Sequence, residues 1–221
     1  MTTTQRPGRG RPARIDQAST VDAALALLDD VGFDALTMRR LAARLGVQAG
    51  ALYRHFATKQ ELLTAMAERM LAAIAEPPAA ADWPEQLSEL ARALRRALLA
   101  HRDGAMVYGG THSTGPHTLA FAESVVGTLR VAGFRDDHAA RAFLTIVNFV
   151  LGHTLEEQAV IQENLEGAHG PGRLRSAVLA GDYPNLAATM PIITSTEQDG
   201  HFEFALALLI EGLRPLVSAR H

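Results

Sequence analysis

The sequence predicts an all-α fold in which a small N-terminal helix-turn-helix unit precedes a larger helical domain. Three observations support this prediction. Apolar residues recur at spacings of three and four, capping residues and glycines bound the periodic segments, and nothing reads convincingly as a strand. With 221 residues, 48% of them hydrophobic and 20% charged, the chain has the composition of a globular protein with a sizeable core.

The first sixty residues predict three short helices. A helix that begins at Asp16 or Ser19 ends at Gly32, a residue typical of helix C-termini. Thr37 can cap a second helix, which ends at Gly46. A third helix begins only two residues later. Three helices in about 40 residues, with a short glycine-containing turn between the last two, are typical of a helix-turn-helix unit.

The rest of the chain predicts longer amphipathic helices. The first is capped by Thr58 and runs to Pro77 and Pro78, and two more lie at 83–101 and 116–132. Another begins at Asp136 and continues to about Glu156, and the last lies at about 201–218. Glycines and prolines interrupt residues 163–200, where one or two short helices and loops are expected. The last helix carries a heptad-like stripe that should pack against another helix, formed by Phe202, Leu206, Leu209, Leu213 and Leu216.

Several protein classes are excluded by composition. No apolar run approaches the ~18 to 20 residues of a membrane-spanning helix, and residues 1–14 lack the apolar stretch of a secretory signal. We therefore expect a soluble, cytoplasmic protein. The absence of cysteine excludes disulfides, thiolate zinc sites and cysteine nucleophiles.

The charge of the chain is unevenly distributed. Residues 1–60 hold nine basic and five acidic side chains, a net charge of +4, whereas the remainder holds twelve basic and nineteen acidic ones, a net charge of −7. A basic end on an acidic body indicates that one end meets a polyanion. Residues 1–14, rich in Thr, Pro, Gly and Arg, predict a flexible basic arm.

Residues 36–56, LTMRRLAARLGVQAGALYRHF, together with Lys59, Leu62 and Leu63, resemble the DNA-binding domain of the tetracycline-repressor family. The match covers residues 16–63 closely. In a helix-turn-helix unit the second helix enters the major groove, where its exposed residues reach base edges. We expect Leu41, Leu45, Leu52 and Phe56 to form the core of this domain.

The resemblance implies a role for each matching position. Arg39 matches a base or phosphate contact, and Thr37 and Tyr53 match phosphate contacts. His55 and Lys59 match further backbone contacts. The residues that face the bases are Gln48, Ala49, Gly50 and Ala51. Ala49 and Gly50 carry no hydrogen-bonding side chain, so readout must depend on Arg39, Gln48, apolar contact with thymine methyl groups and DNA shape.

Arg9 and Arg11 lie in a Pro7–Pro12 segment that resembles the core of an AT-hook, in which an extended Arg-Gly-Arg-Pro strip occupies a narrow minor groove. This favours an arm that embraces DNA, and a disordered tail without that role is the alternative.

The resemblance extends over most of 83–216, most clearly at 97–111, 151–158 and 208–213. It implies a helical body that binds an effector and forms a dimer through a four-helix bundle, with the apolar faces at 143–155 and 202–216 as the matching elements. The expected domains are an arm at 1–14, a DNA-binding domain at 15–62 and an effector-binding and dimerisation domain at 63–221.

The expected effector pocket is bounded by Leu90, Leu94, Tyr108, Thr111, Phe149 and His153, with Glu156 near its mouth. In the tetracycline-binding subclass a histidine at the position of Tyr108 holds a metal, and Glu156 matches a glutamate that reaches that metal through water. A histidine and an asparagine that contact the drug align with Ala75 and Leu90. Here a phenol and apolar groups stand in three of these four places, so we predict no metal or cofactor and a largely apolar or aromatic effector that is not a magnesium–tetracycline chelate.

Together these features predict a homodimeric repressor that binds a palindromic double-stranded DNA operator and is released by a small-molecule effector, with no catalytic activity and no membrane association. Two alternatives remain. One is a constitutive DNA-packaging protein without an effector, and the other is a small helical enzyme that uses His101, Asp103 or Glu156.

Overall fold

The computed structural model describes residues 16–74, 82–111, 113–165 and 170–217. Within these ranges all regular secondary structure is helical, which confirms the predicted all-α fold. The elements are α1 (Gln17–Val31), α2 (Met38–Arg44), α3 (Ala49–Leu52), α4 (Lys59–Leu71), α5 (Trp83–Leu99), α6 (Gly104–Gly109), α7 (Pro116–Val131), α8 (Asp136–Leu165), α9 (Gly170–Ala180), α10 (Pro184–Ile193), α11 (Gln198–Leu213) and the 3-10 turn η1 (Arg214–Leu216). Among these described helices, none is long and apolar enough to cross a membrane.

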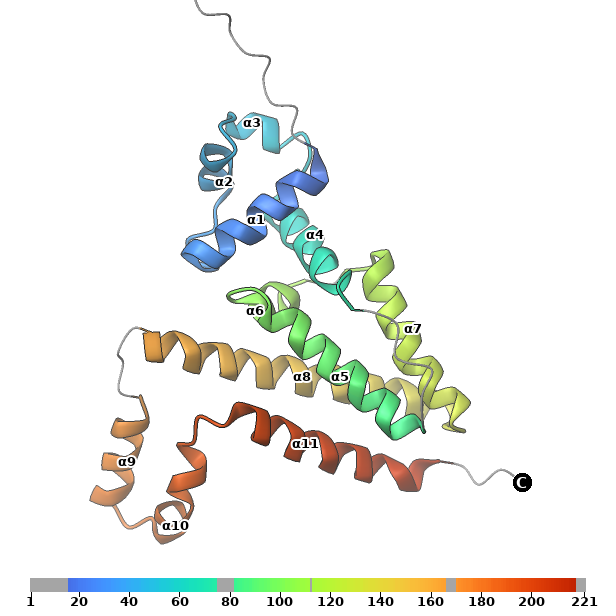
Figure 1. Cartoon of the computed structure of the whole chain (residues 1–221), viewed down its shortest axis with the longest axis vertical. Helices are drawn as coiled ribbons and strands as arrows, with labels where there is room; N and C mark the ends of the chain where they lie inside the picture. Colours follow the sequence, from blue (N-terminus) through green and yellow to red (C-terminus); the bar gives the residue numbers. More distant parts are fainter. Residues whose placement is uncertain (1–15, 75–81, 112, 166–169, 218–221) are drawn as a thin grey trace, which may run out of the picture.

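The molecule has three parts (Figure 1). Helices α1, α2 and α3 form a head at one end. Helices α5 to α8 and α11 form the body, and α4 leads from the head into it. Helices α9 and α10 form a pair that projects from the body.

Local signals fix the helices of the head. The Asp16 side chain accepts a hydrogen bond from the Ser19 amide at 2.8 Å, and Ser19 returns a contact to the Asp16 amide, so the two residues form a capping box at the start of α1. Thr37 caps α2 and Thr58 caps α4 through their hydroxyl oxygens. These caps confirm the predicted starts of the three helices.

Helix α4 belongs to both the head and the body. It packs against α1 and also against α6 and α7. Its side chains Leu62, Leu63, Met66 and Met70 are buried in an apolar cluster that continues from α1 to α11. The domain boundary expected after residue 62 therefore falls inside a helix whose apolar face is continuous.

The body differs from the sequence prediction at two places. A short helix, α6, forms between the helices predicted at 83–101 and 116–132, where the sequence predicts no helix. Helix α8 continues to Leu165, well past Glu156, and no glycine or proline interrupts residues 153–166. The interrupted region 163–200 contains α9 and α10, in agreement with the one or two short helices expected there.

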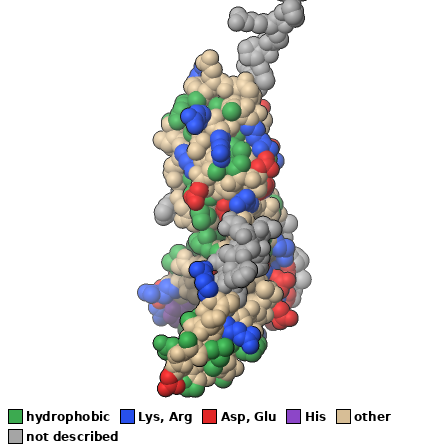
Figure 2. All heavy atoms as spheres, turned by 90° about the vertical axis from the view of Figure 1, so that its left-hand side faces the viewer, with side chains coloured by type: hydrophobic (Ala, Val, Ile, Leu, Met, Phe, Trp, Pro, Cys, Tyr) green, Lys and Arg blue, Asp and Glu red, His purple; other side chains and the backbone are tan. Residues whose placement is uncertain are grey.

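The projecting pair is strongly apolar on its surface. Val178 and Met190 are buried, whereas large apolar side chains lie exposed along both helices, namely Leu174, Leu179, Leu186, Ile192 and Ile193. Hydrophobic side chains gather at this end of the molecule in Figure 2, whereas several Lys and Arg side chains lie toward the head. Such a surface is typical of an element that packs against another chain.

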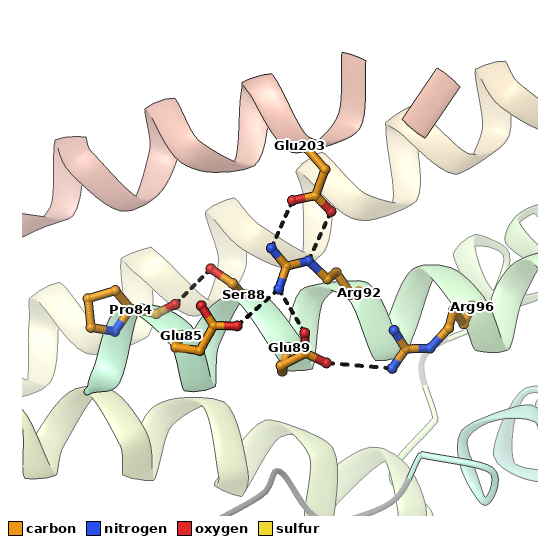
Figure 3. A network of polar contacts seen from close by, with 7 residues as sticks. All are labelled: Pro84, Glu85, Ser88, Glu89, Arg92, Arg96 and Glu203. Carbon is orange, nitrogen blue, oxygen red and sulfur yellow. Dashed lines mark hydrogen bonds and ion pairs between the residues drawn. The ribbon is translucent and has the colours of Figure 1, made fainter. Parts of the chain in front are cut away.

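Polar contacts attach α11 to α5 (Figure 3). The Arg92 guanidinium on α5 donates two hydrogen bonds to the Glu203 carboxylate on α11, at 2.8 and 2.9 Å, and a third to Glu89 at 2.7 Å. The hydrogen bond to Glu203 is the largest cause of the raised pKa of Arg92, so this side chain stays charged.

The apolar stripe predicted on the last helix faces the protomer's own core, except at Leu216, which lies in η1 and is 37% exposed. Phe202 and Leu206 are buried within the protomer, together with Ile210, and Leu209 and Leu213 are half-buried. Phe204 and Leu208, on another face of α11, are 69% and 60% exposed. The stripe therefore serves the protomer's own core, and the outer face of α11 is the one available to a partner.

Candidate DNA-binding surface and effector site

A glycine turn joins α2 to the short helix α3. Gly46 has a φ of 66°, a conformation that L side chains rarely adopt. The Val47 amide donates to the Ala42 carbonyl at 3.0 Å and the Gly46 amide donates to the Ala43 carbonyl at 3.2 Å, the pair of bonds that defines a Schellman motif. The turn is thus fixed, and the start of α3 is held outward from the head.

The expected base-reading residues occupy the outer side of this unit. Gln48 and Gly50 are exposed, and Ala49 and Ala51 are half-buried. Regular helix ends at Leu52, but the amide of Phe56 still donates to the Leu52 carbonyl at 2.9 Å. The structure therefore places these four residues in one turn on the outer side of the head.

The four apolar residues assigned to the head core behave as expected. Leu41, Leu52 and Phe56 are buried, and Leu45 is half-buried against the same cluster. Burial on the inner side leaves the outer side polar and accessible.

The expected phosphate-contacting residues surround that turn. Arg39 and Thr37 are exposed near the start of α2, and Tyr53 is 51% exposed. The Lys59 ammonium lies 4.8 Å from the centroid of the Phe33 ring, a cation–π contact that positions this half-buried side chain. His55 is half-buried, and its carbonyl accepts a hydrogen bond from Gln17 at 3.1 Å.

Arg54 is an additional candidate that the motif did not select. Its side chain is exposed directly after Tyr53, and within the described part of the chain it forms no ion pair. By contrast, Arg44 and Arg69 are paired with Asp30 and Asp22. An exposed arginine beside the recognition turn, in a chain with only one lysine, is the signal that could have identified it.

The positive charge of the N-terminal end comes from the arm. Residues 16–60 hold five basic and five acidic side chains, so the net charge of +4 belongs to the four arginines before residue 16. Arg9 and Arg11 lie outside the described residues. The head by itself is electrically balanced.

A polar junction joins the end of α1 to the turn between α5 and α6. The Asp29 carboxylate lies 3.0 Å from the His101 Nδ1 and accepts from the Arg102 amide at 2.9 Å. The Asp103 carboxylate accepts from the Phe33 amide at 2.8 Å. His101 and Asp103, two of the three residues that the enzyme alternative could use, thus connect the head to the body.

Helix α8 holds the same turn from the other side. The buried Gln158 carboxamide donates to the Leu98 and His101 carbonyls at 3.1 and 2.9 Å, and it accepts from the Ala105 amide at 3.1 Å. Three hydrogen bonds from one side chain fix the turn in the body.

A small cavity lies between α4, α5 and α7. Its volume is about 100 Å³. Of the expected effector residues only Leu90 lines it, and the full lining is Leu71, Ile74, Leu90, His117, Ala120, Phe121 and Ser124. We call this space the α7 cavity. It is smaller than the ~300 to 1,000 Å³ typical of ligand pockets, so a ligand of drug size must widen it.

Two other expected effector residues lie at a different place. The rings of Phe149 and His153 pack with Phe202 of α11, with the centroid of Phe202 5.2 Å from that of Phe149 and 5.3 Å from that of His153. His153 Nε2 is buried and has no hydrogen-bond partner within the described residues. Burial is the largest cause of its lowered pKa, so this imidazole is neutral at pH 7.

The remaining effector residues differ in environment. Leu94 is buried, and Glu156 is exposed on α8 while its neighbour Glu157 points inward. Thr111 donates to the Tyr108 carbonyl at 2.9 Å. Burial, and then the charge of Glu68, raise the pKa of Tyr108, which keeps its phenol protonated. Of these seven residues, the α7 cavity brings in only Leu90, and the ring cluster at Phe202 brings in Phe149 and His153.

Metal-binding groups are sparse in the described ranges. They contain no cluster of three or more His, Asp or Glu side chains that could hold a metal ion. Ala75 and His112 lie outside those ranges.

Family models match nearly the whole chain. Residues 21–66 match the family described as bacterial regulatory proteins, tetR family, and residues 76–217 match the tetracyclin repressor-like C-terminal domain. Among curated proteins, the chain is 40% identical to the tetracycline repressor protein class A from transposon 1721 of Escherichia coli, over 90% of this chain and 91% of that protein.

Solved structures show the same similarity. A crystal structure of a "possible TetR family transcriptional regulator" from Streptomyces coelicolor A3(2) is 57% identical, with a TM-score of 0.85, and covers 90% of this chain and 99% of that one. ActR from Streptomyces coelicolor in complex with actinorhodin is 33% identical, with a TM-score of 0.81, over 94% and 100% of the two chains. A TetR variant from Acinetobacter baumannii AYE in complex with minocycline is 35% identical, with a TM-score of 0.73, over 93% and 100%.

Proposed function

Since the chain belongs to the TetR family of bacterial transcriptional regulators, we propose that its head reads a palindromic operator while its body binds an effector that releases the DNA. The members of the TetR family are transcriptional regulators. This chain is therefore a ligand-responsive repressor that binds DNA as a homodimer. The observation that supports the mechanism best is the fixed, exposed turn at α3, held by the Gly46 motif above a buried inner face.

Operator recognition divides between two groups of residues. Tyr53, Lys59 and Thr37 bind phosphates and set the register of the head, with the arm arginines Arg9 and Arg11 in the minor groove. Arg39, Gln48 and the small side chains at 49–51 select the bases. We add Arg54 to the phosphate-binding group because of its exposure and its lack of an acidic partner in the described residues.

The dimer forms through the outer faces of α8 and α11. Leu144 and Ile161 on α8 and Phe204 and Leu208 on α11 are large apolar side chains that a protomer leaves exposed. The projecting pair of α9 and α10 extends this apolar surface. Burial of such a surface against a second copy stabilises the dimer and places two heads on one DNA duplex, with recognition helices ~34 to 36 Å apart.

The effector is a largely apolar or aromatic molecule and not a magnesium–tetracycline chelate. Tyr108 presents a protonated phenol where the tetracycline-binding subclass has a histidine, and a neutral phenol is a poor ligand for Mg²⁺. Leu71, Leu90 and Phe121 supply apolar wall to the α7 cavity, and His117 and Ser124 supply a few polar groups. A ligand that favours a widened cavity by ~2.7 kcal/mol lowers operator affinity ~100-fold.

Neither alternative has support at its site. His101 and Asp103 are held in the junction between α1 and the α5–α6 turn, and Glu156 lies exposed on α8. The described residues contain no group of side chains that could hold a catalytic metal ion. A DNA-packaging protein needs no cavity beside the connecting helix. We assign the protein to the cytoplasm, where a DNA-binding regulator finds its operator.

The test is operator selection followed by ligand release. The purified chain is mixed with a pool of random DNA duplexes, and the bound duplexes are selected and sequenced. We expect a single palindromic sequence to be selected, and sedimentation experiments should show that a dimer binds it. A panel of apolar aromatic compounds should then include one that releases the duplex. Binding of all duplexes with similar affinity, with no compound releasing them, would favour the packaging alternative instead.

A further inference from the structure

Glu68 makes the most extensive polar contact between the connecting helix α4 and the body. Its carboxylate accepts hydrogen bonds from the Ser113 hydroxyl at 2.6 Å, the His117 amide at 3.0 Å and the Thr118 amide at 3.1 Å. The Thr118 hydroxyl donates to it as well. One side chain of α4 therefore caps the first turn of α7, 45 to 50 residues away in sequence.

Gly115 leaves the space that this carboxylate occupies. A Cβ atom at Gly115 would lie 2.2 Å from Glu68 Cδ and 2.4 Å from Oε2. The backbone at Gly115 has φ −73° and ψ 166°, which any residue adopts, so the glycine is required for space and not for conformation. We call the contact of Glu68 with Ser113, Gly115, His117 and Thr118 the α4–α7 latch.

The latch lies between the cavity and the head. His117, whose amide binds Glu68, also lines the α7 cavity. At the other end, α4 begins directly after the recognition turn, and Lys59 in its first turn contacts Phe33 of the head. Because α4 is one uninterrupted helix from Lys59 to Leu71, a movement of its latched end also moves the head.

We propose that Glu68 is a positioning residue, which fixes the orientation of the head on the body and thereby the spacing of the two recognition turns in the dimer. This inference rests on the proposed function. Filling of the α7 cavity displaces the first turn of α7 and strains or opens the latch, so the residue passes the effect of a ligand to α4. A cap that only stabilises α7 would leave the orientation of the head unchanged.

The first experiment measures orientation without DNA. The chain has no cysteine, so spin labels can be placed at two exposed positions, Ala43→Cys in α2 and Arg96→Cys in α5. The doubly labelled chain is mixed with an excess of unlabelled chain, so that most labelled dimers contain one labelled protomer. The distance measured between the two spin labels is then the distance between head and body within one protomer. The parent should give one narrow distance distribution, whereas Glu68→Gln and Gly115→Ala should each give a broadened or shifted one.

Two further variants make the result specific. Glu61→Gln alters a carboxylate on the same helix that caps the Ala57 amide and does not reach α7, so it should keep the parent distribution. Combining Glu68→Ala with Gly115→Ala should have no more effect than Glu68→Ala alone, because the carboxylate that the added methyl group would displace is already absent.

The second experiment uses the selected operator with its half-sites moved apart or together by one base pair, which rotates one head by about 34 to 36° relative to the other. Glu68→Gln should reduce the parent's preference for the natural spacing by about fivefold or more. An unchanged spacing preference and an unchanged label distance in both latch variants would overturn the proposal. So would an equal loss of affinity at every spacing with a parent-like distance, which is the result of a purely stabilising cap. Failure to select any operator would refute the proposed function. The distances between the spin labels would still show whether Glu68 fixes the orientation of the head.

Discussion

Arg95 and Glu157 form a buried, bidentate ion pair between α5 and α8. The guanidinium donates two hydrogen bonds to the carboxylate, at 2.7 and 2.9 Å, and both side chains are about one-tenth exposed. The same guanidinium lies 4.7 Å from the centroid of the Phe202 ring on α11. The pair and this ring contact thus hold α5, α8 and α11 together, and α8 and α11 carry the proposed dimer face.

Glu157→Gln should destabilise the protein strongly. The substitution removes the buried charge that faces Arg95 and leaves only the exposed Asp199 carboxylate, 2.6 Å from the guanidinium, as its charged partner. Breaking a buried pair costs up to ~3 to 5 kcal/mol. Urea unfolding followed by circular dichroism gives the free energy of unfolding. Glu203→Gln is the matched control, because its pair with Arg92 is more exposed and should contribute about 1 kcal/mol or less. Equal effects of the two substitutions would contradict the prediction.

Substitutions at the head should separate affinity from sequence preference. Tyr53→Ala, Lys59→Ala and Arg54→Ala should each weaken binding to all duplexes and flatten the dependence of affinity on salt, with a slope change of about one unit per lost phosphate contact. Arg39→Ala should instead relax the sequence preference. Fluorescence anisotropy over a series of salt concentrations measures both. Arg130→Ala, on α7, is a control expected to behave like the parent, and parent-like binding by all four head variants would refute the site.

The dimer should depend on the outer face of α11. Replacing both Phe204 and Leu208 by Glu places unpaired charges where an apolar partner surface is expected, which costs several kcal/mol per buried site. Sedimentation should then detect monomers that have lost operator binding. Val131→Glu is the control, because Val131 is 79% exposed at the end of α7 and belongs to neither of the helices, α8 and α11, whose outer faces form the proposed interface. A stable dimer of the Phe204 and Leu208 variant would place the interface elsewhere.

Tetracycline with excess magnesium should not bind tightly. The protonated Tyr108 phenol does not replace an imidazole as a ligand for the cation. Titration calorimetry with and without EDTA tests this directly. Micromolar binding that EDTA abolishes would show that a metal chelate is the effector after all.

The α4–α7 latch should weaken in acid. Burial tends to raise the pKa of Glu68, but the hydrogen bonds from Ser113, Thr118 and the His117 amide outweigh it, and the net pKa is below the ordinary value of 4.5. A carboxyl whose pKa is lowered by folding stabilises the protein above its unfolded pKa, and this contribution is lost as the pH falls through the folded pKa. The difference in unfolding free energy between the parent and Glu68→Gln should therefore be largest near pH 7 and shrink below about pH 4.5. A difference that grows on acidification would contradict this account.

The head could be predicted from the sequence because its signals are local. Asp16, Thr37 and Thr58 cap the helices that follow them directly, and Gly46 lies close after the helix it ends. The exposed outer side of α3 follows from the same pattern, since Leu52 and Phe56 turn the other side inward.

The body could be predicted less well because its decisive contacts join distant residues. Nothing near Glu68 in the sequence indicates that it caps α7, and nothing near Arg95 indicates Glu157. The periodicity of α11 shows that one of its faces is apolar, but it does not show which surface packs against that face. The sequence therefore could not assign the stripe to the protomer's own core. The resemblance groups Phe149 and His153 with Leu90, whereas they pack beside Phe202.

The continuity of α4 has a consequence for the construction of chimeric regulators. A new DNA specificity is often sought by grafting one head onto another body, and a fusion point after residue 62 would cut α4 within its buried row. It would also separate Asp29 from the His101 and Arg102 it contacts in the body. A graft that exchanges residues 16–71 as a unit, and transfers the matching 101–103 turn and the residues facing Glu68, keeps donor and recipient surfaces complementary.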